Sequence, residues 1–462
     1  MDQHIQIQLH HFLAGILCIV LLLTVGCSSV KPAQKRTTPH DQPKKETDAP
    51  RVYNPSTGKY EPVEDPKKMV DTIEFREDKK TTPIGSSDER KTGKKALYEV
   101  AFLIPFDADD NPSYTGSMDP KVRRFLHYYG GVKMALQDLA DRGLRISASV
   151  YDTQDSPEQA KRLIQSLDHV DAVVGPYEME SLRDAALFST RKKVPVFSPW
   201  TPSIPLDSDN PWFIQLNPGL EAHAVAIVDY LDTHMGDAKV YMVARNDVRE
   251  KNRLNLFRDA HAKNISLPSY EELIIDDASA NLNKTLLNKL IAHKGSTVFI
   301  MPYYSRNDED FVSAFLRKLH AEKGTGTVFV FGMPQWLTFN KLNSDYLESA
   351  NVHVSTAHFM DPSDPDVRAF QTRFLEEYGT LPEPAAHQAF EFMLFLGEAL
   401  NNYGTGFLDF VSDRLHASTG DVFDLVPVYR NPIPEKQNVP NYLENHAIHI
   451  LHFKDQAFRR VE

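Results

Sequence analysis

The sequence predicts an α/β fold built on parallel sheets, because short apolar runs alternate with stretches of helical period. The clearest region is residues 146–201, where apolar runs at 146–150, 172–174 and 194–197 are separated by two amphipathic stretches. Strands that alternate with helices form right-handed βαβ units and therefore a parallel sheet. Ligands bind beyond the carboxyl ends of such strands, so the residues that follow each run are candidate site residues.

Both amphipathic stretches carry helix signals. In the first, Ser156 can act as the N-cap, Pro157 suits the first helical position, and Gln159 completes a capping box. Apolar residues recur at helical spacing in each stretch, and we expect them to pack against the sheet. They are Ala160, Leu163, Ile164 and Leu167 in the first stretch, and Leu182, Ala185, Ala186 and Phe188 in the second.

Three motifs in this region resemble the type I periplasmic binding fold, the Leu/Ile/Val-binding-protein-like receptor family. Residues 152–157, 171–176 and 194–199 match, in order, the family's helix start, its D-A-V-I-G-P strand and its I-P-x-I-S-P strand. The resemblance extends over about residues 97–461, with further matching segments at 100–105, 129–141, 210–217, 239–244, 296–302 and 327–332. It implies two doubly wound parallel-sheet lobes joined by three crossovers, with a ligand cleft at the strand ends.

The resemblance also divides the chain into lobes. We expect lobe one at residues 97–218 plus 352–403, and lobe two at residues 219–351 plus 404–462. The crossing back into lobe one would then follow the strand at 327–332. In the tail, the segments that read as strands are 422–429, 447–453 and 457–461. Gly130 and Gly131 stand near an expected helix start, where the absence of side chains permits close packing.

Residues 1–27 resemble a bacterial lipoprotein signal peptide. Residues 12–25 are almost wholly apolar and too short to span a bilayer comfortably. Gly26 precedes Cys27, the residue that would be lipidated. Thr24 stands where such signals usually have Leu, and no Lys or Arg precedes the apolar run, so an uncleaved amino-terminal anchor is the alternative.

Cleavage before Cys27 would leave no disulfide, because the only other cysteine is Cys18 within the apolar run. Ser28 after the lipidated residue favours the periplasmic face of the outer membrane over the inner membrane. Residues 28–95 are rich in Pro and charged residues and poor in large apolar ones, which predicts a disordered tether. A small docking element at residues 51–62 is the alternative, since that stretch carries turn residues.

Composition and motifs argue against several classes of function. The formal net charge is -12, without a basic stripe, which argues against a nucleic-acid partner. The motifs HExxH, GxSxG and GxxxxGK(S/T) are absent from the sequence, so we expect neither an enzyme nor a cofactor. His446, His449 and His452 recur every three residues, but in a strand the middle one faces away from the others, so we predict no metal site.

The candidate ligand-binding residues follow the predicted strands of both lobes. In lobe one they are Asp107, Tyr114, Tyr177, Glu178, Ser181, Trp200 and Thr201. In lobe two they are Asn246, Tyr303, Tyr304, Gln335 and Trp336. Aromatic side chains at such loops supply an apolar wall with a polar edge. The alternative for Trp200 and Trp336 is that they fill an interface between the lobes.

The resemblance also bears on the ligand. In amino-acid binders of this family, hydroxyl groups hold the ligand carboxylate, and Thr201 and Ser181 match that role. However, Glu178 and Glu180 stand in the same loop and would repel a carboxylate. Residues 331–335 contain no acidic residue to hold an amine. The ligand therefore remains open between an amino acid and another neutral, cationic or larger polar solute.

Two functions follow from these features. The first is a lipid-anchored periplasmic receptor in the cell envelope that captures a small solute by hinge closure of two lobes, with a permease as its partner. The alternative is an envelope regulator with the same fold that binds protein, for example a cell-wall enzyme as an activator of peptidoglycan synthesis. The resemblance of both lobes to solute receptors favours the first function.

Overall fold

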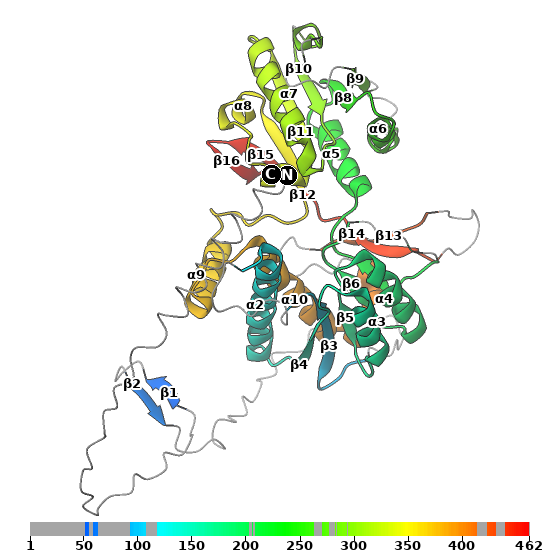
Figure 1. Ribbon diagram of the computed structural model, residues 1–462, viewed down its shortest axis with the longest axis vertical. Helices are drawn as coiled ribbons and strands as arrows, with labels where there is room; N and C mark the ends of the chain where they lie inside the picture. Colours follow the sequence, from blue (N-terminus) through cyan, green and yellow to red (C-terminus); the bar gives the residue numbers. More distant parts are fainter. Residues whose placement is uncertain are drawn as a thin grey trace, which may run out of the picture. The chain divides into compact units, whose positions relative to one another are not determined.

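The computed structural model describes most of the chain (Figure 1). The described residues are 51–54, 59–62, 93–107, 118–202, 206, 208–262, 270–276, 282, 284–292, 294–413, 423–430 and 439–461. The predicted signal peptide, with Cys27, and the candidate site residue Tyr114 lie outside them. Residues 88–462 form one compact unit that contains two seven-stranded sheets. Within the described residues, every helix is too short or too polar to cross a membrane.

The first sheet has the strand order β13-β14-β7-β6-β5-β3-β4, and only β13 and β14 pair in antiparallel fashion. Its strands are β3 (Tyr98–Ile104), β4 (Ile146–Asp152), β5 (Ala172–Val174), β6 (Val196–Ser198), β7 (Phe213–Gln215), β13 (Leu425–Val428) and β14 (Tyr442–Asn445). Its helices are α2 (Pro120–Asp141), α3 (Pro157–Ser166), α4 (Met179–Lys192), α9 (Pro365–Tyr378) and α10 (Pro384–Tyr403), which leads into the 3-10 helix η5 (Gly404–Asp413). Helices α2 and α10 cover one face of the sheet, and α3 and α4 cover the other.

The second sheet has the order β16-β15-β12-β11-β10-β8-β9, with β15 antiparallel to both of its neighbours. Its strands are β8 (Lys239–Arg245), β9 (Glu271–Ile275), β10 (Ser296–Ile300), β11 (Thr327–Gly332), β12 (Val352–Thr356), β15 (His449–Lys454) and β16 (Ala457–Arg460). The helices packed on it are α5 (Leu220–His234), α6 (Val248–His261), α7 (Glu309–Glu322) and α8 (Ser344–Ser349). Short 3-10 helices are η2 (Leu287–Lys289), η3 (Arg306–Asp308) and η4 (Pro334–Thr338). The predicted α/β class with two doubly wound, mostly parallel sheets is confirmed.

Each sheet contains one point at which the strand order reverses. From β3 the chain adds β4 on one side and then β5 on the other, and from β8 it adds β9 and then β10 in the same way. The loops on either side of such a point diverge and leave a crevice at the carboxyl ends of the strands. The fold therefore places one candidate binding edge beyond β3 and β5, and another beyond β8 and β10.

The chain passes between the sheets three times, after β7, after β12 and after β14. The first and third crossings are bonded to each other. A carboxylate oxygen of Glu444 accepts hydrogen bonds of 2.7 Å from the Gly219 backbone N–H and of 2.7 Å from the Gln215 side-chain amide. The side-chain amide of Asn445 donates to the Leu216 carbonyl at 3.2 Å. The hydrogen bonds among these five residues hold the two crossings side by side.

The strand pairing differs from two predicted lobe boundaries. Strand β12, predicted in lobe one, belongs to the second sheet, so the chain crosses back one strand later than expected. Strands β13 and β14, predicted in lobe two, complete the first sheet. An apolar strand contains no signal for which of two similar sheets it joins, because both offer the same kind of buried edge.

Several local predictions are confirmed. The Ser156 hydroxyl caps α3 by accepting the Gln159 N–H at 3.2 Å, and Pro157 is the first residue of the helix. The prediction that Gly131 permits close packing is also confirmed, although this residue lies in the middle of α2 rather than at its start. A Cβ atom there would stand 1.9 Å from the Ala386 carbonyl oxygen, so only glycine lets α2 and α10 approach this closely.

A β-hairpin lies within the segment predicted as a disordered tether. Strands β1 (Arg51–Asn54) and β2 (Lys59–Pro62) pair in antiparallel register, with Arg51 opposite Pro62 and Asn54 opposite Lys59. The hairpin belongs to a unit separate from residues 88–462. The expectation of disorder along all of residues 28–95 is therefore wrong for residues 51–54 and 59–62. The hairpin lies in the stretch for which the sequence offers a small docking element as the alternative.

Strand β15 joins the second sheet through a pair of stacked histidines. The rings of His353 on β12 and His452 on β15 lie 4.4 Å apart, and His353 also stacks on Phe331 at 4.7 Å. Burial lowers the pKa of His353 to about 4. Burial likewise lowers the pKa of His223, on α5, to about 4. Both imidazoles are therefore neutral in the folded protein near neutral pH.

We expect the free energy of unfolding to fall as the pH falls from 6.5 towards 4. In the unfolded chain, both histidines have a pKa of about 6.5 and become protonated in this pH range, whereas in the folded state they stay neutral until the pH approaches 4. Each of the two histidines should contribute about 2 kcal/mol of this loss between about pH 7 and pH 5. His353→Gln should remove about half of their combined effect in urea unfolding at the two pH values. His169→Gln, whose side chain is 90% exposed, is the control. Equal pH dependence in both variants would contradict the prediction.

Candidate functional site

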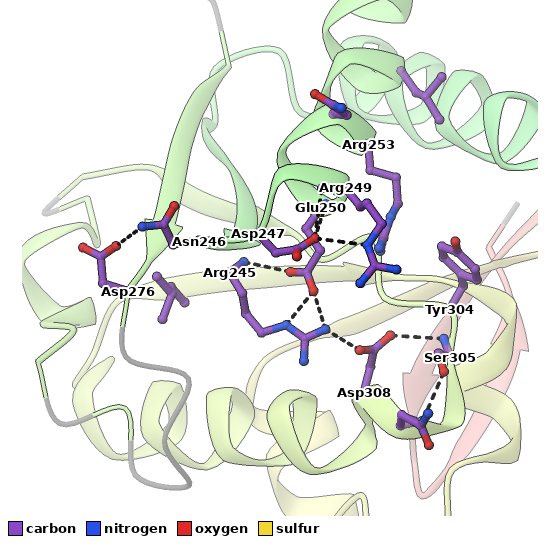
Figure 2. Close-up of a pocket in the computed structure, with 14 residues that line it drawn as sticks. Arg245, Asn246, Asp247, Arg249, Glu250, Arg253, Asp276, Tyr304, Ser305 and Asp308 are labelled. Carbon is purple, nitrogen blue, oxygen red and sulfur yellow. Dashed lines mark hydrogen bonds and ion pairs between the residues drawn. The ribbon is translucent and has the colours of Figure 1, made fainter.

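A pocket of about 970 Å³ lies at the carboxyl ends of β8, β9 and β10, beside the first turns of α6 (Figure 2). This is the edge at which the order of the second sheet reverses. The pocket's charged residues comprise three arginines and four acids: Arg245, Arg249, Arg253, Asp247, Glu250, Asp276 and Asp308. The lining is therefore strongly polar, with a small excess of carboxylates.

Arg245 is bound tightly by two carboxylates at the base of this pocket. Its Nε donates to Glu250 at 2.7 Å and its Nη2 to Asp308 at 2.5 Å, while its backbone N–H donates to Glu250 at 2.9 Å (Figure 2). Both acids are 6% exposed. Burial alone would lower the pKa of Arg245, but the hydrogen bonds that it donates to the two carboxylates raise this pKa above its usual value. Two of the three guanidinium nitrogens, Nε and Nη2, are thus ion-paired within the pocket wall.

The rim of the pocket carries more accessible groups. The Arg249 side chain is 90% exposed, with Asp247 3.7 Å away. Tyr304 is 45% exposed, and the guanidinium of Arg253 lies 4.7 Å from its ring centroid. Asn246 donates to Asp276 at 2.7 Å. A cation, an aromatic ring and amide groups are thus available at the rim to a polar molecule.

An aromatic cluster forms the corresponding edge of the first sheet. The ring of Trp200 lies 5.2 Å from Phe125 and 5.1 Å from Tyr128, both edge to face, and Tyr177 lies 5.2 Å from Phe125. The Thr201 hydroxyl donates to the Tyr177 carbonyl at 3.3 Å. The loops after β5 and β6 are therefore locked together, with Trp200 at their junction.

Around this cluster, several buried polar atoms find no hydrogen-bond partner among the described residues. They are Arg124 Nε, Tyr128 Oη, Glu178 Oε2, Ser181 Oγ and Ser198 Oγ. Burial raises the pKa of the Glu178 carboxyl, and the nearby Asp155 carboxylate adds to the shift. A buried polar atom without a partner costs about 1–3 kcal/mol, so the concentration of such atoms makes this sheet edge a candidate site for a polar molecule.

The structure brings most of the predicted site residues to these two edges. Tyr177, Glu178, Ser181, Trp200 and Thr201 lie together in the first lobe, as predicted from the loops after β5 and β6. Asn246 and Tyr304 line the pocket of the second lobe. Asp107 follows β3, where its backbone N–H donates to Asp152 at 3.2 Å.

Three predicted residues of the second lobe do not line this pocket. Tyr303 is 0% exposed and Trp336 is 2% exposed, so both belong to the core of the second lobe. The Trp336 indole N–H donates to the Tyr303 carbonyl at 3.0 Å, and the ring packs onto Gly332, which has no side chain to obstruct it. Gln335 lies half-buried in η4, and its Oε1 has no partner within the described structure.

Sequence reasoning missed the ion cluster that supports the pocket. Arg245, Glu250 and Asp308 were not predicted, although Arg245 directly follows a predicted strand. The local signal was the acidic pair Asp247 and Glu250 at the start of a helix, which resembles a capping pattern. The third member, Asp308, is 63 residues away from Arg245, so the charge pair could not be seen before the fold was known.

Comparison with known proteins identifies the family. Residues 127–445, more than half of the chain, match the family described as the receptor family ligand binding region. No curated protein matches the chain. The family is defined by ligand binding, which agrees with the prediction that the chain is not an enzyme.

Solved structures of substrate-binding proteins share the fold. One from Desulfitobacterium hafniense, in complex with Leu, is 16% identical with a TM-score of 0.50, over 79% of this chain and 100% of that one. A putative branched-chain amino acid ABC transporter protein from Rhodospirillum rubrum is 16% identical with a TM-score of 0.55, over 79% and 100%. A periplasmic ligand-binding protein of a branched-chain amino acid transporter from Burkholderia xenovorans is 14% identical with a TM-score of 0.52, over 79% and 94%. These likenesses confirm the predicted type I periplasmic binding fold.

We expect Glu250→Gln to destabilise the folded protein by about 3 kcal/mol, because it leaves a largely buried guanidinium with one carboxylate instead of two. The midpoint of urea unfolding measures the loss. Asn246→Ala on the exposed rim is the control and should leave the midpoint within about 0.5 kcal/mol of the parent. An unchanged midpoint in Glu250→Gln would show that the ion cluster does not stabilise this edge.

Proposed function

The chain belongs to the family described as the receptor family ligand binding region. On this basis we propose that it is a receptor for a small polar solute. The observation that carries the proposal is the polar pocket of about 970 Å³ beyond β8, β9 and β10, at the reversal of strand order. Open α/β sheets bind their ligands at this position. The aromatic edge of the first lobe, where several buried polar atoms have no partner among the described residues, would supply the second contact surface, and closure of the lobes would bring the two surfaces to one ligand.

The charges favour a ligand with amine or hydroxyl groups over one with an aliphatic side chain. The pocket of the second lobe has four carboxylates against three guanidinium groups, one of which is held by Glu250 and Asp308. Glu178 adds a carboxyl at the aromatic edge of the first lobe. A branched-chain amino acid such as the Leu in the Desulfitobacterium hafniense complex would instead need an apolar pocket for its side chain.

The amino-terminal sequence supports a lipid anchor at Cys27 and a place in the cell envelope, on the periplasmic face of the outer membrane. A permease would be the partner of such a receptor. The alternative, a regulator that binds a cell-wall enzyme, draws support from the long charged segment between Cys27 and the folded unit, because a tether extends the reach of an anchored protein.

A thermal-shift screen of the full chain tests solute binding. A ligand that binds only the folded state raises the melting temperature in proportion to the logarithm of its concentration. We expect one class among amino acids, dipeptides, nucleosides, sugars and muropeptides to give a saturable shift. For that class, Tyr304→Ala and Thr201→Val should each raise the Kd at least about tenfold. Tyr429→Ala is the matched control, because Tyr429 is 42% exposed and Tyr304 is 45% exposed.

The absence of a shift with every class would overturn solute binding and favour the protein-binding regulator. An equal loss of affinity in Tyr429→Ala would instead refute the assignment of the pocket, because Tyr429 lies outside it.

The anchor has its own test. Metabolic labelling with a radioactive fatty acid should mark the protein in bacterial cells, and Cys27→Ser should abolish the label, because the thiol is the attachment point. Cys18→Ser is the matched control and should retain it. A label that persists in Cys27→Ser would exclude the proposed lipidation.

A further inference from the structure

Two histidines and a glutamate meet between the second crossing and helix α10. His358 follows β12 in the segment that leads back to the first sheet, while His387 and Glu391 lie one turn apart on α10. Because positions i and i+4 of a helix share a face, α10 presents its two side chains together. A carboxylate oxygen of Glu391 lies 3.2 Å from Nδ1 of His358 and 3.3 Å from Nδ1 of His387.

The cluster is largely buried. His387 is 6% exposed, and the side chains of His358 and Glu391 are each 18% exposed. The ring of Phe370 packs edge to face on His387 at 5.0 Å. Nε2 of His358 is buried without a hydrogen-bond partner among the residues that the structure describes.

A small cavity opens onto this cluster. It has a volume of about 110 Å³ and is lined by His358 and Glu391 together with polar groups such as Asn217, Thr356 and Asn445. A water molecule in liquid occupies about 30 Å³, so the cavity has room for water beside the cluster. Its wall includes residues of all three crossings, because Asn217 lies in the first, His358 in the second and Asn445 at the end of β14, where the third begins.

We propose that His358, His387 and Glu391 bind a divalent transition-metal ion of the zinc class. Two imidazoles and one carboxylate form a typical zinc donor set, whereas Mg²⁺ and Ca²⁺ prefer oxygen ligands alone. Metal–ligand bonds of about 2.0–2.1 Å place tetrahedral ligand atoms about 3.3 Å apart. The two separations of 3.2 and 3.3 Å match this edge, and candidate ligand atoms of all three residues lie within 4.8 Å of one another. The cavity leaves a coordination position for water.

The position of this site gives the metal a mechanical role. One ligand belongs to the segment that joins the two sheets, and the other two belong to a helix of the first lobe. A bound ion therefore ties the second crossing to α10 and restricts any motion of the lobes about the crossings. This role is independent of the identity of the solute and of whether the polar pocket binds it.

Calorimetric titration of the full chain with Zn²⁺, after treatment with a chelator, tests the site. We expect one saturable site that Mg²⁺ does not occupy, and Co²⁺ should give the visible absorption of a tetrahedral complex. Loss of even an outer-shell partner typically lowers metal affinity 10- to 100-fold. His358 and Glu391 are direct ligands in the proposed site, so His358→Ala and Glu391→Gln should each raise the Kd for Zn²⁺ at least about tenfold. His169→Ala, at an exposed histidine, should leave this Kd unchanged.

The controls separate loss of the site from loss of the fold. Circular dichroism will show whether Glu391→Gln is folded. If Glu391→Gln does not fold, the Kd of His358→Ala decides the test, because that substitution lies in a crossing segment rather than inside α10. Absence of Zn²⁺ binding, or a Kd that both variants leave unchanged, would overturn the proposal.

Discussion

The buried carboxylate of Glu444 is the point on which the two-lobed arrangement depends. It is 5% exposed, and its hydrogen bonds reach Gln215 at the end of β7, Gly219 in the first crossing and His446 in the third. A buried carboxylate is tolerated only with such partners, so the crossings cannot separate without exposing an unpaired charge to an apolar environment. Gly219 is also the N-cap of α5, where the positive end of the helix dipole favours the anionic side chain.

The two candidate binding edges are built in different ways. In the second lobe, Arg245 is ion-paired with both Glu250 and Asp308, which restrains the base of the pocket before any ligand arrives. Among the described residues of the first lobe, Glu178 and Ser181 each have a buried polar atom without a hydrogen-bond partner, near Trp200. The proposed ligand would therefore meet an ion-paired surface with a small excess of carboxylates in the second lobe and an aromatic edge with unsatisfied polar atoms in the first. A hydrogen bond to any of these atoms would offset its desolvation penalty.

The fold was largely predictable from the sequence, because strand and helix periods are local properties. The start of α3 at Pro157 and the apolar stripe of α4 needed only neighbouring residues. The assignment of β12 to the second sheet could not be predicted from the sequence, because an apolar strand can pair with either sheet. The burial of Trp336 could not be predicted either, because it depends on the space above Gly332 and on packing that the loop sequence does not reveal. The pairing of Arg245 with Asp308 requires the sheet to bring distant loops together.

The contribution of the tail to both sheets has a consequence for how the chain is made. Strand β14 lies inside the first sheet, between β13 and β7, and β15 lies inside the second, between β16 and β12. During synthesis, the edges of β7 and β12 stay open until these much later strands have left the ribosome. Neither sheet can therefore be completed before residues 442–454 have been made.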